Sequence, residues 1–211
     1  MENNYKKTGI FFLLIIPLVA IGFYPTYFGL YPEFNQNIDF LVHWHFFLSA
    51  VWIAVLIAQP FLILNKKYQW HRFLGRATYV IFPLWILSFI PMINNVIQKG
   101  LYKNLVFPVG IMVLLIILFA LAIKNRKTTA NHMRYMIASA VVIIDPTIGR
   151  VTFNFFKDDL IGMPITFAIM NLVLLGLIWM DKRNGKDYQP YLVALACFIV
   201  YNISFFIVFL T

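Results

Sequence analysis

Two histidines, each placed to begin a helix after a basic stretch, are the first residues here whose types suggest chemistry. His71 lies in NKKYQWHRFLGR (65–76) and His132 in NHMRYM, and long apolar runs flank both segments. Two imidazoles at similar depth on two helices hold a haem iron when small residues beside them admit the macrocycle. Gly75 and Ser139 lie on the same helical faces and meet that requirement. The pattern predicts a shared cofactor between His71 and His132, with haem b as the candidate.

The alternative for these two histidines is contact with lipid. Arg72, Arg76 and Arg134 lie beside them in the sequence. Cationic and aromatic side chains are ordinary at a membrane interface, where they bind headgroup phosphates. This interpretation requires no cofactor.

Asp145 is the residue with the highest expected cost in a membrane. It lies in an apolar stretch, eleven residues beyond Arg134. An Asp at the centre of a spanning helix costs about 2.5 to 3.5 kcal/mol on insertion scales, so it needs a partner or a proton. We expect Asp145 to face the protein interior and to bond Asn171, Tyr201 or Asn202, which lie at similar depth. A ligand or proton site and a structural hydrogen bond are both open.

Arg150 and His45 complete the candidate residues. Arg150 lies about 140° around the helix from Asp145, so an ion pair on one helical face is not expected. His45 forms an H-x-H pair with His43, and in a helix the two lie about 200° apart, so they cannot share a metal unless the helix begins after them. His45 shares its face with Trp52 and is expected to be the inward one. We predict no catalytic residue and no metal site, and the predicted cofactor-binding residues are His45, His71, His132, Asp145 and Arg150.

The composition predicts an all-α, polytopic membrane protein. The chain is 62% hydrophobic and only 12% charged, which is too apolar for a soluble domain of 211 residues. Uninterrupted apolar runs near twenty residues, without strict alternation, indicate helices and not a barrel. The net charge of +9 comes from short loops, so we assign it to topology and anionic lipid headgroups, not to nucleic acid. The single cysteine, Cys197, excludes a disulfide or a thiolate metal site within one chain.

Seven apolar segments are predicted to cross the bilayer as a single transmembrane domain over residues 1–211. The first is interpreted as an uncleaved span, because no clear small-residue cleavage site follows it. Pro83 and Pro91 are expected to kink the third. The seven segments are 10–24, 40–64, 73–93, 105–123, 133–153, 163–180 and 191–210.

The distribution of Lys and Arg orients these segments, because basic loops stay in the cytoplasm. Thirteen of the 17 basic residues fall in alternate loops, which places the N-terminus in the cytoplasm and the C-terminus in the periplasm. The thirteen are Lys6, Lys7, Lys66, Lys67, Arg72, Arg76, Lys124, Arg126, Lys127, Arg134, Lys182, Arg183 and Lys186.

Motifs over residues 22–150 resemble a family of small, uncharacterised bacterial inner-membrane proteins. These are GFYPTYF, then H-x-H, HR-x-LG, and H-x-R-x-M followed by a Pro and an Arg; Met133 stands where that family has a basic residue. The H-x-R-x-M-x-A portion is also similar to small membrane proteins that assist assembly of haem-copper oxidases. The resemblance implies a location in the bacterial inner membrane and no established reaction. The matching residues are His43, His45, Gln59, His71, Arg72, Gly75, His132, Arg134, Met136, Pro146 and Arg150.

These features lead to one preferred function and two alternatives. The preferred one is a protein that binds haem or another small ligand within the helix bundle, in a respiratory or haem-related role. The first alternative is a small-molecule or proton-coupled transporter that uses Asp145, and the second is a structural or assembly subunit of a membrane complex. The expected partners are the lipid bilayer, anionic headgroups and a small-molecule ligand. No ATP-binding loop, serine hydrolase elbow or zinc helix is present to indicate an enzyme.

Overall fold

A computed structural model describes residues 2, 5–34 and 39–211, and every regular element in these residues is helical. The all-α expectation is therefore confirmed. Among the described residues, six helices are long and apolar enough to cross a membrane: Phe40–Leu64, Tyr68–Gln98, Tyr102–Lys124, Thr129–Phe156, Asp159–Arg183 and Gln189–Leu210.

The first apolar segment is shorter than the other six. It forms α1 (Thr8–Leu13) and α2 (Ile15–Phe23), which follow each other directly. The apolar stretch Thr8–Phe23 reaches only about 24 Å at ~1.5 Å per residue, less than the ~30 Å of a hydrocarbon core. The seventh span therefore stays a prediction.

The long helices are apolar on their exposed faces as well as on their buried ones. Only 22 to 50% of the residues in their most apolar windows are buried. Val80 and Val200 are each 64% exposed, and Leu172 is 65% exposed. Apolar surface on this scale is unfavourable in water and favourable in hydrocarbon. The distribution is that of a helical membrane protein.

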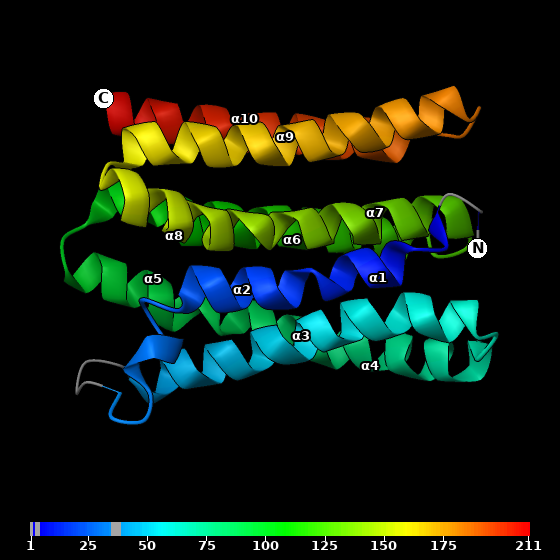
Figure 1. Ribbon diagram of the computed structural model, residues 1–211, viewed down its shortest axis with the longest axis horizontal. Helices are drawn as coiled ribbons and strands as arrows, with labels where there is room; N and C mark the ends of the chain where they lie inside the picture. The colour runs from blue at the N-terminus through cyan, green and yellow to red at the C-terminus, as the bar shows by residue number, and fades with distance from the viewer. Residues whose placement is uncertain (1, 3–4, 35–38) are drawn as a thin grey trace. The chain divides into compact units, whose positions relative to one another are not determined.

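The chain divides into two compact units, Met1–Gly100 and Leu101–Thr211. In the first unit, α3 packs against both α1 and α4, and α3 and α4 form a hairpin (Figure 1). The single domain expected over 1–211 stays a prediction. Besides α1 and α2, the first unit contains η2 (Phe28–Leu30), α3 (Phe40–Leu64), α4 (Tyr68–Leu87) and α5 (Phe89–Gln98).

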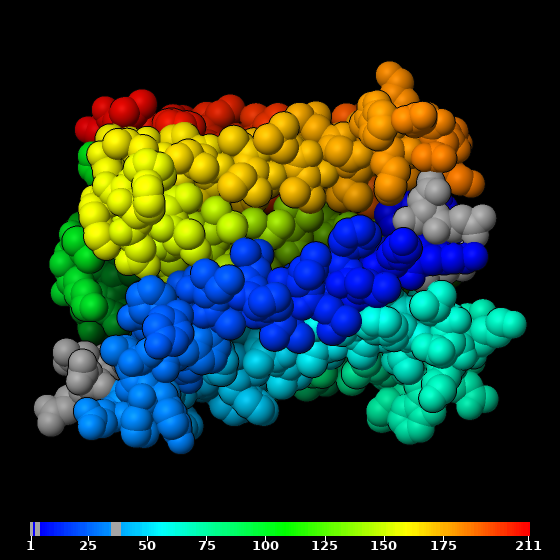
Figure 2. Space-filling model, in the orientation of Figure 1, coloured from blue at the N-terminus to red at the C-terminus, as the bar shows by residue number. Residues whose placement is uncertain are grey.

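The second unit is built around one helical rod formed by α7 and α8. This rod packs against α6, α9 and α10, and half of its most apolar window is buried, the highest share among the six spans. Helix α9 covers part of the face drawn in Figure 2. The elements of the unit are η3 (Tyr102–Leu105), α6 (Val106–Lys124), α7 (Thr129–Val142), α8 (Ile144–Phe156), α9 (Asp159–Arg183) and α10 (Gln189–Leu210).

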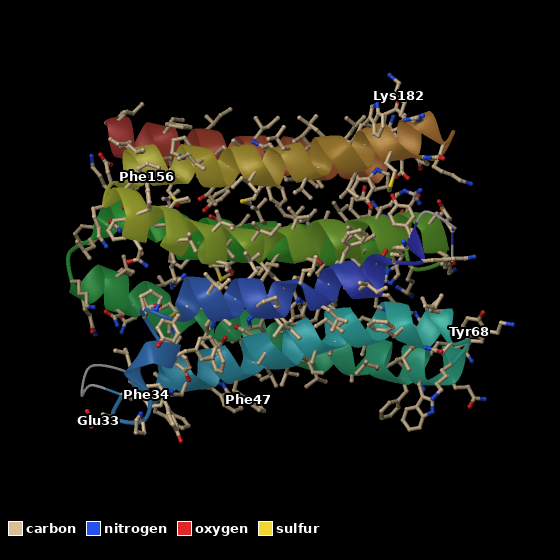
Figure 3. The ribbon with its side chains drawn as sticks, in the orientation of Figure 1. Glu33, Phe34, Phe47, Tyr68, Phe156 and Lys182 are labelled. Atoms are coloured by element: carbon tan, nitrogen blue, oxygen red, sulfur yellow. The ribbon has the colours of Figure 1, made fainter. Side chains whose placement is uncertain are left out.

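The two ends of the second unit carry different side chains. Figure 3 labels Lys182 near the end of α9 and Phe156 at the end of α8, at opposite ends of the unit. We call the end with Lys182 the basic end, because six exposed cations lie there, in the last residues of α6 and α9 and in the loops that follow them. These are Lys124, Arg126, Lys127, Lys182, Arg183 and Lys186.

Proline interrupts one helix in each unit. Helix α7 ends at Val142, and the break at Ile143 lies three residues before Pro146. Helix α4 ends at Leu87, and the break at Ser88 lies three residues before Pro91. A proline lacks the N–H that would bond the carbonyl one turn earlier, so the helix breaks there. The kink predicted at Pro91 corresponds to the break at Ser88, whereas α4 continues through Pro83.

Candidate functional site

The side chain of Asp145 lies inside the second unit, where the residue is 2% exposed. Its Oδ2 accepts a hydrogen bond of 2.6 Å from the hydroxyl of Tyr201, which is 4% exposed. Asp145 is the second residue of α8, directly after the break, and Tyr201 lies in the middle of α10. The prediction that Asp145 faces the interior and bonds one of three named residues is confirmed, with Tyr201 as the partner.

Gly110 on α6 makes room for this tyrosine. A Cβ atom added at Gly110 would overlap the Tyr201 ring, because the ring lies directly against the α6 backbone. Three helices therefore meet at one contact: α6 supplies the space, α10 the phenol and α8 the carboxylate. The sequence analysis did not select Gly110, and the only signal was a glycine within an otherwise apolar helix.

The two asparagines predicted beside Asp145 take no part in this bond. The Oδ1 atoms of Asn171 and Asn202 are buried and accept no hydrogen bond from the described residues. A buried amide oxygen is normally paired, often with water. Each asparagine therefore places an amide oxygen that can accept a hydrogen bond inside the second unit.

Arg150 lies one turn beyond Asp145 on α8 and is half-buried. Its Nη1 donates a hydrogen bond of 2.6 Å to the carbonyl oxygen of Pro146. This contact stays on its own helix.

Other buried polar residues of α7 and α8 form hydrogen bonds within their own helix. The hydroxyls of Ser139 and Thr147 donate to carbonyl oxygens three and four residues earlier, at 2.8 and 2.9 Å. Thr152 does the same and also lies 3.2 Å from the hydroxyl of Thr166 on α9. Asp145 differs from these residues because it is ionisable and its hydrogen-bond donor comes from another helix.

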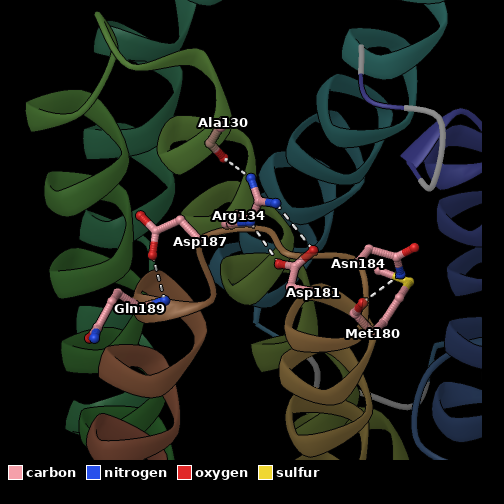
Figure 4. A network of polar contacts seen from close by, with 7 residues as sticks. All are labelled: Ala130, Arg134, Met180, Asp181, Asn184, Asp187 and Gln189. Atoms are coloured by element: carbon pink, nitrogen blue, oxygen red, sulfur yellow. Dashed lines mark hydrogen bonds and ion pairs between the residues drawn. The ribbon is translucent and has the colours of Figure 1, made fainter.

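A second buried polar contact joins α7 to α9 at the basic end (Figure 4). Arg134 Nε donates to Asp181 Oδ2 at 2.7 Å, and Nη2 donates to Oδ1 at 3.1 Å. Both side chains are fully buried. A third donor, Nη1, bonds the carbonyl oxygen of Ala130 at 3.1 Å. This two-point geometry is the strong form of an arginine–carboxylate pair.

The sequence analysis missed Asp181, and it treated Arg134 as a cytoplasmic cation beside His132 and as a residue of the H-x-R-x-M motif. The available signal was one acidic residue within the basic stretch MDKRNGK. The backbone around it is also fixed, since Lys186 N donates to Asp181 O and Asp187 caps the N–H of Gln189. The pair therefore holds the α9–α10 turn as well as α7.

His132 is the fourth residue of α7, as expected of a residue that opens a helix. Its Nδ1 lies 2.8 Å from the carbonyl oxygen of Ala122 at the end of α6. A carbonyl only accepts, so Nδ1 carries the proton and Nε2 carries the lone pair. Metal-binding histidines have this arrangement, although the same bond also ties the α6–α7 hairpin together.

His71 is likewise the fourth residue of its helix, α4. The amide nitrogen of Gln59 donates to the carbonyl oxygen of His71 at 3.4 Å and lies 3.7 Å from the place of a Cβ on Gly75. Gln59 therefore lies beside Gly75, where the sequence predicted space for a macrocycle, and that space stays a prediction. His71 belongs to the first unit and His132 to the second, so their shared ligand stays a prediction.

The two histidines of H-x-H have separate partners in the first unit. His43 Nδ1 lies 2.8 Å from the hydroxyl of Tyr27. Burial raises the pKa of Tyr27, which keeps this phenol protonated as a donor. His45 Nδ1 lies 2.8 Å from Ser88 Oγ, which itself donates to the carbonyl oxygen of Trp85 at 2.5 Å. The pair does not converge, and the described residues contain no group of three or more His, Cys, Asp or Glu that could hold a metal.

His45 belongs to a polar network that ties α3 to the break between α4 and α5. Trp85 Nε1 donates to Ser49 Oγ at 2.8 Å, and Ser49 donates to the carbonyl oxygen of His45. With the His45–Ser88 bond, this network joins the two helices. The expectation that His45 is the more inward of the two histidines stays a prediction, because His43 and His45 are both half-buried and each lies beside a hydroxyl.

Comparison of the chain with protein-family models, with curated proteins and with solved structures gave no match. The family resemblance drawn from the motifs stays a prediction. The function is therefore inferred from the site itself.

We expect Asp181→Ala to destabilise the second unit by about 3 to 5 kcal/mol, because it leaves the Arg134 guanidinium buried without its carboxylate. The measurement is unfolding of the purified protein in mixed detergent micelles, followed by tryptophan fluorescence. The matched control is Asp187→Ala, which removes an exposed carboxylate that caps one N–H and should cost about 1 kcal/mol or less. Equal losses in the two variants would contradict the assignment.

Proposed function

We propose that this chain is a multi-pass protein of the bacterial inner membrane that couples transport to a proton carried on Asp145. The observation behind this proposal is the position of Asp145, which is buried inside the second unit, accepts a hydrogen bond from the Tyr201 hydroxyl and interacts electrostatically with Arg150 on its own helix. Ionisable residues within a membrane are costly and usually mark ion or proton pathways.

The Asp145–Tyr201 pair suits proton exchange. A phenol hydroxyl both donates and accepts, so it can donate to the carboxylate and accept from the carboxylic acid. The pair therefore keeps a hydrogen bond in either protonation state. A purely structural bond needs no ionisable group, because an amide or a hydroxyl makes it without the cost of burying a charge.

The break beside Asp145 supports the same function. Asp145 lies sixteen residues after Thr129, the first residue of the 28-residue rod Thr129–Phe156. This places it about 24 Å from the basic end and near the middle of the rod. Transporters place their binding sites where membrane helices are discontinuous, because the unwound backbone offers free polar groups. Pro146 has no N–H for the carbonyl one turn earlier, so α7–α8 is interrupted beside Asp145, while Ile143 keeps right-handed helical dihedral angles and its N–H bonds the carbonyl oxygen of Ala140.

We expect Asp145→Asn to fold like the wild type and to lose proton flux. The amide retains an acceptor for Tyr201 but binds no proton at neutral pH. The assay is the decay of an imposed pH gradient in proteoliposomes that contain a trapped pH dye, with folding checked by circular dichroism and size exclusion. Flux in Asp145→Asn should fall to the level of empty vesicles.

The control for this experiment is Asp187→Asn, since Asp187 is exposed in the α9–α10 loop. This variant should retain wild-type flux. Undiminished flux in Asp145→Asn would make the carboxylate structural.

The proposal includes an orientation in which the basic end faces the cytoplasm. Its six exposed cations then contact anionic headgroups, and Arg183 stacks over Trp179 at 5.2 Å, as is common at an interface. Helix α10 then runs from the basic end to a periplasmic C-terminus, and the N-terminus lies in the cytoplasm if the first apolar segment also spans the bilayer.

Reporter fusions test this orientation. Fusions after Lys67, Lys127 and Lys186 should report a cytoplasmic location, and one after Lys99 a periplasmic location, since each follows a predicted span. Two or more reversed results would refute it.

A second candidate function, haem binding in a respiratory or haem-related role, is favoured by the fixed tautomer of His132. The lone pair on Nε2 fits an axial ligand, and a bound haem would supply a redox-active iron. The counterpart predicted from the sequence is His71, which lies in the first unit. Neither observation bears on the third candidate, an assembly subunit of a membrane complex.

An absorption spectrum tests the haem candidate. Protein expressed with adequate haem should show a Soret band that disappears in His132→Ala and persists in His43→Ala, whose imidazole bonds Tyr27 instead. A colourless wild-type protein would exclude this function.

A further inference from the structure

A groove of about 440 Å³ runs between α6 and α10 in the second unit. Six residues of α6, from Val106 to Ile117, and five of α10, from Ala196 to Ser204, line it. We propose that this groove holds one hydrocarbon chain of a membrane phospholipid, lying along both helices against the Tyr201 ring.

The chemistry of the lining favours a hydrocarbon occupant. The polar side chains of the groove are already bonded, since Ser204 Oγ donates to the carbonyl oxygen of Val200 at 2.8 Å and Tyr201 donates to Asp145. The helices α6 and α10 lie in the two most apolar of the six spans, with mean hydropathies of 3.0 and 2.5. A polar ligand would lose its hydration here and gain no hydrogen bond in return.

The dimensions of the groove favour a chain over a compact ligand. The eleven-residue step from Val106 to Ile117 covers about 16 Å along α6. One leaflet of a bilayer contributes about half of the ~30 Å hydrocarbon core, or ~15 Å, which matches this length. The groove begins at the start of α6, opposite the basic end, so the chain belongs to the leaflet away from the basic loops.

The floor of the groove connects this site to Asp145. The ring of Tyr201 lines the groove, lies against Gly110 and presents its hydroxyl to the carboxylate. A chain seated in the groove packs against the part of this ring that lines it and restrains the ring. Lipid occupancy thereby positions Tyr201, a role that goes beyond the proposed transport and does not require it.

The test uses the full-length protein in vesicles that contain a phospholipid with a photoreactive diazirine midway along one acyl chain. Cross-linked peptides are identified by mass spectrometry. We expect adducts on the groove segments of α6 and α10 at several times the yield found around Leu172, which is 65% exposed on α9. Equal yields on both surfaces would overturn the proposal.

Two variants fill the groove from opposite walls: Val113→Trp on α6 and Ala196→Trp on α10, both at exposed positions. Each should reduce the groove adducts several-fold, whereas the matched control Leu172→Trp should leave them unchanged. If one variant fails to fold, the other provides the measurement. Unchanged groove adducts in a folded variant would also overturn the proposal.

Asp145→Asn separates this inference from the proposed function. The variant should lose proton flux and keep its groove adducts, because the groove lining is unaltered. Loss of the groove adducts in folded Asp145→Asn would contradict an independent lipid site.

Discussion

In a medium without water, a buried polar group is stabilised by partners within the protein, and this constraint shapes most of the buried polar contacts of the second unit. Arg134 and Asp181 satisfy it as a two-point ion pair between α7 and α9. The buried hydroxyls satisfy it with carbonyl oxygens on their own helix. Asp145 satisfies it with a single phenol from α10. The Arg134–Asp181 ion pair has little freedom to change its protonation state, whereas the Asp145–Tyr201 pair has that freedom. We therefore place the function at Asp145.

The two units solve the same packing problem with different chemistry. In the first unit, neutral groups join α3 to the α4–α5 break, through His45, Ser88, Trp85 and Ser49. In the second, ionisable groups join α7–α8 to its neighbours. A break three residues before a proline occurs in both units, but only the second places a carboxylate beside it. The same backbone device thus supports a structural network in one unit and a candidate proton site in the other.

The sequence patterns predicted features that depend on the position of a residue along its helix. They missed contacts that depend on how two helices are rotated against each other. The second segment was predicted as 40–64 and forms Phe40–Leu64, because hydrophobicity and length decide where a span begins and ends. The interior position of Asp145 followed from the cost of exposing it to lipid, and Tyr201 followed from its depth.

The missed residues all depend on which faces of two helices meet. Asp181 was missed because its pairing with Arg134 joins residues 47 positions apart on separate helices. Gly110 and the groove between α6 and α10 were missed for the same reason, and Gln59 was not expected to lie beside Gly75. Hydropathy gives the depth of a side chain and carries little information about its neighbour.

The close approach of Gly110 and Tyr201 also constrains how this protein can evolve. A side chain at position 110 and an aromatic ring at position 201 exclude each other, because the ring occupies the volume that a Cβ would need. A side chain at position 110 is tolerated only after the ring at position 201 has been lost, so drift at these two sites is correlated. Lineages that keep the carboxylate at 145 and its phenol would retain glycine at 110, and lineages that lose the phenol would release that glycine to vary.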